Sequence, residues 1–309
     1  MTRPPKLDLI AAVPDAAGVQ EEKAMRVQTR NGRRRLVAVV VALGVTLTSV
    51  LFGWVAPAQA VPSPSLAVAV SAFNSVSPKA AVATCPGALV VYGAGGTIGG
   101  GGGSVVLSDV IPTMTTVTAW GIETAPFAGN WSVTAYAICG PANGNVIVTY
   151  ATGASPVTPK SGIALCPAGT SLYGTGYELD GANGQVFPSI VRPDVALSNV
   201  TVGAFATGGF AGNWNLIAYG ICANPAANMQ LVTAQSGLNP GSPKTVTTAA
   251  CPGNLNVHGV GAEISGGLGD VLLDGMAPNA ILTTSQSDAD EFVPVAANWA
   301  IISYAICSS

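Results

Sequence analysis

The sequence predicts an all-β protein made of three homologous units that each contain one disulfide. Three observations favour this fold class. The chain has an internal repeat that aligns on its 6 cysteines. The segments between glycine and proline positions are short and rich in Val, Ile, Thr and aromatic residues, as is typical of strands. The region after residue 60 contains no amphipathic run of helical length.

The repeat aligns in two halves. The first half aligns without a gap on a Cys-Pro pair at Cys85, Cys166 and Cys251, with glycines eight and ten residues later and a proline 27 residues later. The second half aligns on the endings NWSVTAYAIC, NWNLIAYGIC and NWAIISYAIC. A repeat of this period marks one structural unit, so we expect units at 61–140, 141–223 and 224–309, each with roughly six to eight strands.

Each unit opens with an apolar stretch and a Pro-Lys pair, which we interpret as a polar turn before a strand. The pairs contain all the lysines after residue 60, namely Lys79, Lys160 and Lys244. The units form either a closed pseudo-threefold arrangement or three β-sandwich modules in tandem. In the closed arrangement we expect the opening strand at 66–72 to pair with the last unit, which would remove two exposed sheet edges.

The shared endings are typical of strands. In NWNLIAYGIC, a period of two places Trp214, Leu216, Ala218 and Cys222 on one face and Ile217, Tyr219 and Ile221 on the other. Both faces are largely apolar, so we expect the strand to be covered on both sides. We expect the Trp of each ending to lie in the core near the disulfide rather than to form a platform for sugars.

The segment VVYGAGGTIGG, residues 90–100, has the clustered glycines of a dinucleotide-binding turn. Its counterparts SLYGTGYELDG and NVHGVGAEISG share only the glycines at the two fixed offsets. No helix is expected after it, so no helix N-terminus is present to bind a pyrophosphate. We interpret the segment as a strand, a glycine kink and a hairpin with a glycine-rich loop, and we expect no cofactor.

Six cysteines in an exported chain indicate three disulfides. Pairing within units gives Cys85–Cys139, Cys166–Cys222 and Cys251–Cys307, with nearly constant separations. Pairing across units is the alternative, but we favour the first because a constant separation is expected of a bridge inside one module. The cysteines lack the close spacing of a metal site, and we expect no metal.

Catalytic groups are few. The single histidine, His258, occupies the position of Tyr92 and Tyr173 in the other units, so we expect it to pack rather than to act as a base. Glu178 and Glu263 occupy equivalent positions, with Asp109, Asp270 and Asp274 nearby in their units, and such carboxylates could support glycoside hydrolysis. The spacing alone brings no two of them together, so we expect no enzyme activity.

Two features could contact a ligand. Asp288, Asp290 and Glu291 form the one acidic cluster, which we interpret as a solvated loop, with Ca²⁺ binding as the alternative. Trp120 has no tryptophan counterpart in the other units and is the best candidate for an exposed aromatic side chain.

The N-terminal segment predicts export. Eight of the 12 basic residues lie at or before Arg35, an apolar run follows to Val55, and Ala58-Gln59-Ala60 fits a cleavage site. This order is typical of a secretory signal, so we expect residues 1–60 to be removed, with Met25 a possible true start. An uncleaved segment would be the only part of the chain to contact a membrane.

The remaining chain carries four basic and 11 acidic residues, a net charge of −7, which argues against a nucleic-acid partner. The order C-P-x-G (as in Cys166–Gly169), G-x-G, N-W and Y-A-I-C resembles a repeat module of exported actinobacterial proteins whose activity is not established. It is more distantly similar to the vitelline membrane outer layer proteins, and that resemblance implies a β-prism-like fold.

We therefore expect a secreted or cell-surface protein without catalytic activity, with a cell-envelope polysaccharide or matrix as its partner. One alternative is a structural envelope protein that associates with itself, because a weakly charged β surface favours such contacts. A carboxylate-dependent glycoside hydrolase is another alternative.

Overall fold

The computed structural model describes residues 63–309, and the expected signal segment at 1–60 lies outside this range. The described residues form 18 strands and one short 3₁₀ turn, Pro252–Asn254. Over the same residues, no helix is long and apolar enough to cross a bilayer. The all-β prediction is confirmed.

Each unit contributes six strands. The first unit contains β1 (Ser65–Val70), β2 (Lys79–Thr84), β3 (Val90–Gly99), β4 (Val105–Pro112), β5 (Thr116–Glu123) and β6 (Ser132–Gly140). The second contains β7 (Val146–Ala151), β8 (Lys160–Leu165), β9 (Ser171–Asp180), β10 (Val186–Pro193), β11 (Asn199–Ala206) and β12 (Asn215–Ala223). The third contains β13 (Gln230–Gln235), β14 (Lys244–Thr247), β15 (Asn256–Ser265), β16 (Val271–Pro278), β17 (Ser285–Glu291) and β18 (Ala300–Ser308).

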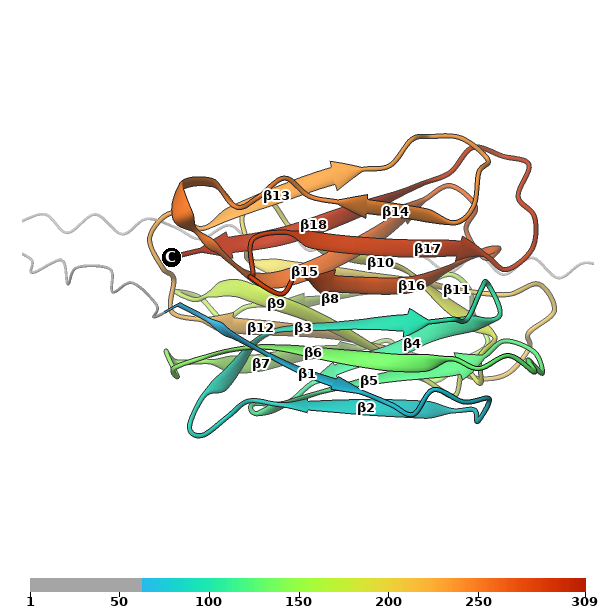
Figure 1. Ribbon diagram of the computed structural model, residues 1–309, viewed down its shortest axis with the longest axis horizontal. Coiled ribbons are helices and arrows are strands. Elements are labelled where there is room, and N and C mark those ends of the chain that lie inside the picture. The colour runs from blue at the N-terminus through green and yellow to red at the C-terminus, as the bar shows by residue number, and fades with distance from the viewer. Residues whose placement is uncertain (1–62) are drawn as a thin grey trace, which may run out of the picture. The chain divides into compact units, whose positions relative to one another are not determined.

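The strands form three six-stranded sheets, and each sheet joins half of one unit to half of another (Figure 1). The orders are β1-β6-β3-β16-β17-β14, β2-β5-β4-β9-β12-β7 and β13-β18-β15-β10-β11-β8. We call these the 1/3 sheet, the 1/2 sheet and the 2/3 sheet after the units that contribute to them. Within a unit, the first, sixth and third strands lie in one sheet, and the second, fifth and fourth lie in another.

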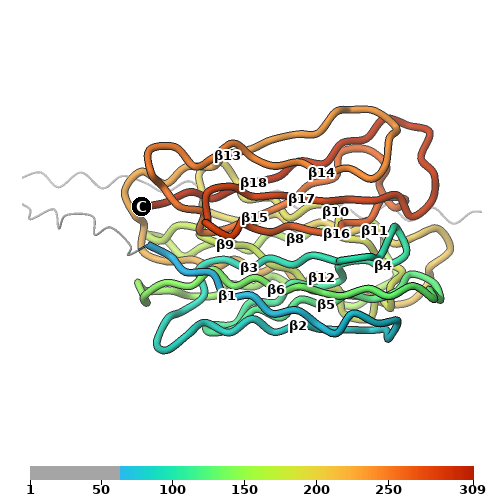
Figure 2. The backbone as a smooth tube through the Cα atoms, in the orientation of Figure 1, coloured from blue at the N-terminus to red at the C-terminus, as the bar shows by residue number. Residues whose placement is uncertain are grey.

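The pairing between units closes a cycle. β3 pairs with β16, β9 pairs with β4, and β15 pairs with β10, so every unit is hydrogen-bonded to both others. Figure 2 shows β3 and β16 side by side although they are far apart in the chain. Each unit therefore shares one sheet with each of the other two.

Two expectations about connectivity are wrong. β1 pairs with β6 of its own unit and not with the last unit, because the contact between units is made in the middle of each sheet and β1 remains at an edge. β3 and β4 do not form a hairpin. The glycine-rich segment between them passes from the 1/3 sheet to the 1/2 sheet, where β4 pairs with β5.

The glycines of VVYGAGGTIGG have a packing role. A bulge in the third strand of each unit leaves Tyr92, Tyr173 and His258 unpaired in the register, and the three rings meet edge to face with centroids 5.1–5.7 Å apart. A Cβ on the glycine that follows each of them would lie 2.0–2.3 Å from the ring residue's carbonyl oxygen in another unit. Glycine is therefore required where the three backbones meet.

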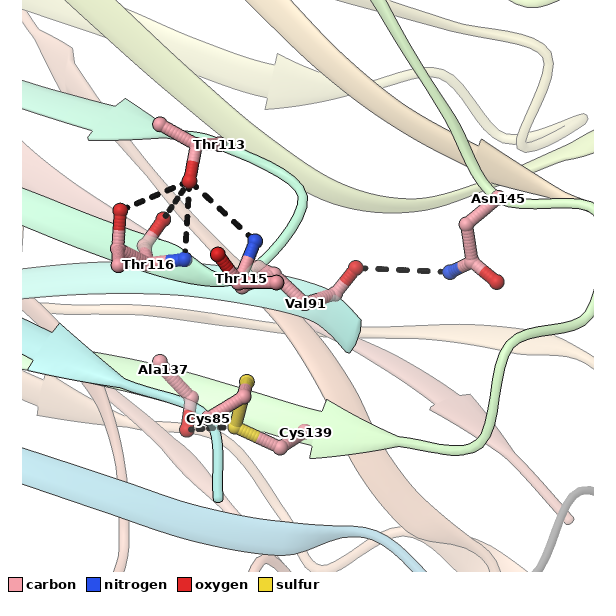
Figure 3. Close-up of a disulfide and its surroundings, with 8 residues drawn as sticks. All are labelled: Cys85, Val91, Thr113, Thr115, Thr116, Ala137, Cys139 and Asn145. Carbon is pink, nitrogen blue, oxygen red and sulfur yellow. Dashed lines mark hydrogen bonds between the residues drawn. A yellow bond between two sulfur atoms is a disulfide. The ribbon is translucent and has the colours of Figure 1, made fainter. Parts of the chain in front are cut away.

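The disulfides pair within units, as predicted. Cys85 follows β2 in the 1/2 sheet and Cys139 lies in β6 of the 1/3 sheet, with their Cα atoms 5.6 Å apart (Figure 3). In the same region Thr113 accepts hydrogen bonds from the backbone of Thr115 and Thr116 at the β4–β5 turn. Each bridge thus joins the two sheets to which its unit contributes.

Each Pro-Lys pair lies where a bend meets the start of a strand, as predicted, but its lysine is not exposed to solvent. The three lysines are buried, and each ammonium group lies 4.1–4.6 Å from the ring centroid of the unit's buried Trp. Each ammonium also donates to backbone carbonyls of the preceding turn; Lys244, for example, donates to Gly237 and Asn239. Burial lowers the pKa of each lysine. This contact escaped sequence analysis because Lys and Trp lie about 50 residues apart in each unit.

The tryptophans of the three shared endings, Trp131, Trp214 and Trp299, are buried, as predicted, but they lie far from the disulfides. Trp214 is eight residues from Cys222 along one extended segment, about 27 Å at the rise of a strand. The expected cover on both faces is also incomplete, because Leu216 and Ala218 are buried whereas Ile217 and Tyr219 are only half-buried. The half-buried face of this strand is the outer face of the 1/2 sheet.

Candidate functional site

Trp120 lies on the strand next to the edge strand β2 of the 1/2 sheet and is exposed on the outer face. It belongs to β5, its side chain is 37% exposed, and its direct partner on β4 is Asp109. Next to β4 lies β9 of the second unit. A cavity of about 340 Å³ opens here, and the residues that define its chemistry are Asp109, Ile111, Trp120, Ile122, Glu178 and Asp180.

Asp109 is held by hydrogen bonds from both sides of the junction between units. Its Oδ1 accepts from the backbone N–H of Leu179 at 2.7 Å, and its Oδ2 accepts from the Ser108 hydroxyl at 2.7 Å. Burial raises the pKa of Asp109, and the nearby carboxylates of Glu178 and Asp180 raise it further, against these hydrogen bonds. Asp109 is therefore a fixed carboxyl group with enhanced proton affinity.

Glu178 is oriented by a tyrosine on the neighbouring strand. The Tyr219 hydroxyl of β12 donates to Oε2 of Glu178 at 2.5 Å. Burial and this contact raise the pKa of Tyr219, so the phenol stays protonated as a donor. One oxygen of Glu178 is thus engaged, and Oε1 has no hydrogen bond to another described residue.

The walls of the cavity come from two units that are locked together. The Tyr177 hydroxyl donates to the carbonyl of Leu107 at 2.7 Å, and the Gln185 amide donates to the carbonyl of Thr124 at 2.7 Å. Gly184 (φ +73°) approaches the carbonyl of Glu123 so closely that a Cβ would lie 2.5 Å from its oxygen. These contacts fix the loop 181–184 against the first unit, so the site is preorganised.

The equivalent places on the other two sheets differ in chemistry. On the 2/3 sheet, Gly203 replaces Trp120 and Arg192 replaces Ile111, and Arg192 forms an ion pair with Glu263 at 2.8 Å. On the 1/3 sheet, Thr97 replaces Glu178 and Asp288 replaces Trp120, beside a cavity of about 170 Å³. Among the three sheets, only the 1/2 sheet combines an exposed tryptophan with carboxylates, Asp109 and Glu178, that form no ion pair.

The acidic cluster of the third unit is not a solvated loop. Asp288, Asp290 and Glu291 lie on β17, a strand of the 1/3 sheet, and each accepts a hydrogen bond from within the protein. Glu291 accepts from the indole N–H of Trp299 at 2.8 Å, and Glu123 plays the same part for Trp131. Over residues 63–309, no group of three or more His, Cys, Asp or Glu side chains is placed to hold a metal ion.

The candidate ligand-binding and catalytic residues named from the sequence do not all lie at one site. Trp120 lies on the 1/2 sheet and the acidic cluster on the 1/3 sheet. Glu178 and Glu263 lie on different sheets, and the neighbour of Glu178 is Asp109 of another unit. His258 is fully buried between two tyrosine rings, as predicted. Trp120 and both carboxylates are recognisable in the sequence, but no sequence pattern indicates that β4 pairs with β9.

Comparison with models of known protein families gave no match, and comparison with curated proteins gave no significant match.

Proposed function

We propose that this is an exported protein, without catalytic activity, that binds a cell-envelope polysaccharide through the Trp120 cavity. The observation that carries the proposal is the pairing of Trp120 with Asp109 across β4 and β5, at the edge of a preformed cavity. A flat aromatic face covers the apolar side of a sugar ring, and adjacent carboxylates accept hydrogen bonds from its hydroxyl groups.

Three further features support the proposal. The three disulfides favour an oxidising compartment, which agrees with the N-terminal signal pattern. The cavity is open to solvent and combines apolar with acidic side chains, as suits one or two residues of a chain rather than a buried cofactor. Its walls are fixed by contacts between units, so binding needs little ordering of the protein.

A second candidate function, glycoside hydrolysis, is favoured by one observation. Asp109 and Glu178 line the same cavity, and the pKa of Asp109 is raised, as in a general acid. In this scheme Asp109 would protonate the leaving oxygen and Glu178 would act as the second carboxylate.

Retention of the oxidised full chain on cell-wall polysaccharide and whole envelope tests both functions, with released reducing sugar assayed in the same tubes. Binding predicts saturable retention without sugar release, and Trp120→Ala should reduce the affinity at least tenfold. Tyr150→Ala is the matched control, because Tyr150 is an exposed aromatic residue on the edge strand β7 of the same sheet.

Sugar release that Asp109→Asn abolishes would replace the binding proposal with hydrolysis. Retention that Trp120→Ala leaves unchanged, or no retention at all, would refute a glycan site at Trp120. A structural or self-associating envelope role would then be the better account.

A further inference from the structure

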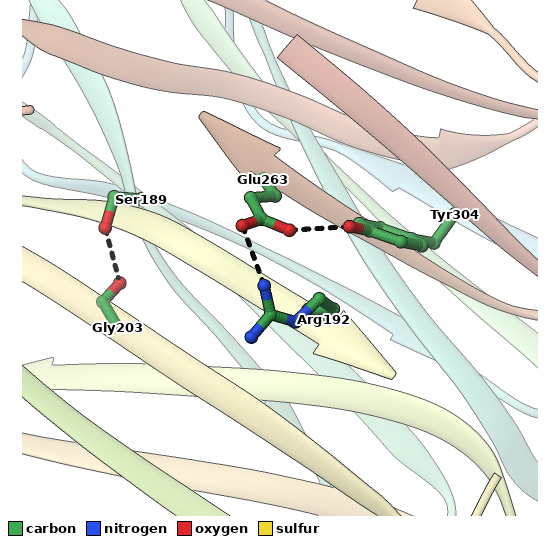
Figure 4. Close-up of polar contacts among 5 residues, drawn as sticks. All are labelled: Ser189, Arg192, Gly203, Glu263 and Tyr304. Atoms are coloured by element: carbon green, nitrogen blue, oxygen red, sulfur yellow. Dashed lines mark hydrogen bonds and ion pairs between the residues drawn. The ribbon is translucent and has the colours of Figure 1, made fainter. Parts of the chain in front are cut away.

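On the 2/3 sheet, a cationic side chain of the protein lies at the position equivalent to the Trp120 cavity. There the guanidinium of Arg192, on β10, lies against Glu263 on β15, and the Tyr304 hydroxyl donates to the other oxygen of that carboxylate at 2.6 Å (Figure 4). The Glu263 side chain is only 16% exposed. A cation contributed by the chain itself therefore occupies the outer face at this junction.

The same carboxylate and tyrosine recur on the 1/2 sheet without the cation. Glu178 and Tyr219 are the repeat equivalents of Glu263 and Tyr304, and they form the same hydrogen bond. Ile111 stands where the other junction has Arg192, and Asp109 adds a second carboxylate. No Lys or Arg is among the residues that line the cavity, and the lysines at 79, 160 and 244 are buried against tryptophans.

Trp120 supplies the other component of a cation site. An ammonium group gains free energy over an indole face, and the gain grows when water is excluded. The protein itself uses this contact three times, since each buried lysine places its ammonium 4.1–4.6 Å from a Trp ring centroid. The cavity thus combines an indole, an oriented carboxylate and a second, half-buried carboxyl group around a position that a guanidinium occupies on the 2/3 sheet.

We propose that the Trp120 cavity binds the free ammonium group of an unacetylated amino sugar within a glycan, with the sugar face on Trp120 and the ammonium between Glu178 and Asp109. This inference rests on the proposed glycan-binding function and specifies its ligand. A neutral or acidic glycan would leave the carboxylates of the site without a counter-charge.

Calorimetric titration of the oxidised full chain at pH 6.5 tests the proposal with three tetrasaccharides: fully deacetylated β-1,4-glucosamine, its N-acetylated form, and β-1,4-glucose. We expect the glucosamine oligomer to bind at least tenfold more tightly than the other two. Glu178→Gln should remove most of this preference, whereas the matched variant Glu263→Gln on the 2/3 sheet should retain it.

A second variant supplies the missing cation from the chain. Ile111→Arg should reproduce the ion pair of the 2/3 sheet, raise the melting temperature and weaken glucosamine binding at least tenfold. Ile111→Leu controls for the change in side-chain size at this position. A folded Ile111→Arg protein that binds glucosamine as tightly as the unmodified protein would overturn the assignment of the cation to this place.

The other outcomes separate the two proposals. Equal affinity for all three oligomers, lost in Trp120→Ala, would overturn the cation inference and leave the glycan-binding function standing. Absence of binding to every oligomer, together with retention on envelope that does not depend on Trp120, would overturn both. Tighter binding of tetralysine than of the glucosamine oligomer would overturn the assignment to a sugar.

Discussion

His258 should make the folded protein sensitive to acid, and replacing it should remove that sensitivity. The ring is fully buried between Tyr92 and Tyr173, its Nδ1 contacts the carbonyl of Asn256 at 3.2 Å, and its Nε2 has no partner. Burial lowers the pKa of His258 from 6.5 to about 4. The two tyrosines avoid this problem, because their hydroxyls donate to the carbonyls of Pro141 and Asn224.

The sign and size of the effect follow from proton linkage. Above pH 6.5 the imidazole is neutral in both the folded and the unfolded chain, and it adds no pH dependence. Below pH 6.5 the unfolded chain binds a proton that the folded protein accepts only near pH 4, so the free energy of unfolding falls as the pH falls. The loss from this residue is about 2 kcal/mol at pH 5 and levels off at about 3 kcal/mol below pH 4.

Urea unfolding of the oxidised protein between pH 4.5 and 7.5 measures this loss. The comparison is with His258→Phe, which keeps a flat ring and cannot titrate. The difference in unfolding free energy between variant and unmodified protein should shift by about 2 kcal/mol in favour of the variant from pH 7.5 to pH 5. Other titrating groups cancel in this difference. Parallel pH curves for the two proteins would refute the idea that His258 is buried in its neutral form.

Three further predictions concern stability at pH 7 and use the same urea assay. Gly174→Ala should unfold the protein or cost more than about 3 kcal/mol, because its Cβ would lie 2.3 Å from the carbonyl oxygen of Tyr92. Gly208→Ala is the control, because Gly208 has nothing within 4 Å and its φ is not in the left-handed region. Equal effects of the two substitutions would contradict the packing role. Asp274→Ser should stabilise the protein by about 1–3 kcal/mol at pH 7, since Oδ1 is buried without a partner and burial raises the pKa of Asp274, with Asp290 and Asp288 raising it further. This gain in stability should shrink as the pH falls, because the Asp274 carboxyl of the folded protein then takes up a proton. A gain that does not change with pH would contradict a buried, unpartnered carboxylate. Ala206→Glu should stabilise the protein by about 1 kcal/mol, because Trp214 Nε1 has no acceptor where Glu123 and Glu291 accept from the equivalent tryptophans of the other units. Glu291→Ala should destabilise the protein, because it removes the acceptor of Trp299. A urea midpoint that neither substitution changes would refute this account.

Much of the fold could be predicted from the chain. The repeat, the strands and the pairing of cysteines within units all depend on local spacing, which a single sequence displays directly. The central packing of His258 also followed from its repeat position, because equivalent positions in a repeat share an environment. The lysine–tryptophan contacts did not follow, since nothing in the spacing of a Pro-Lys pair shows that its ammonium group folds back over a distant indole.

The candidate site, too, could be predicted only in part from the sequence. The residue types were visible in the sequence, and Trp120 was selected because neither of the other two units has a tryptophan there. The partnership of Asp109 with Glu178 was not visible, because it depends on β4 of one unit pairing with β9 of the next. Alternation along a strand says which side chains share a face, but it does not say which strand lies beside it.

The repeat alone indicates three β units, each with its own disulfide, and the N-terminal pattern is typical of an exported chain. How the units join, and where a ligand could bind, depends on the fold. The contacts between units are backbone hydrogen bonds and close glycine packing, which any strand of suitable shape can make, so no residue pattern identifies the partner strand. The side chains on the outer faces then contact side chains of another unit, which gives an ion pair at one junction and an open acidic cavity at another.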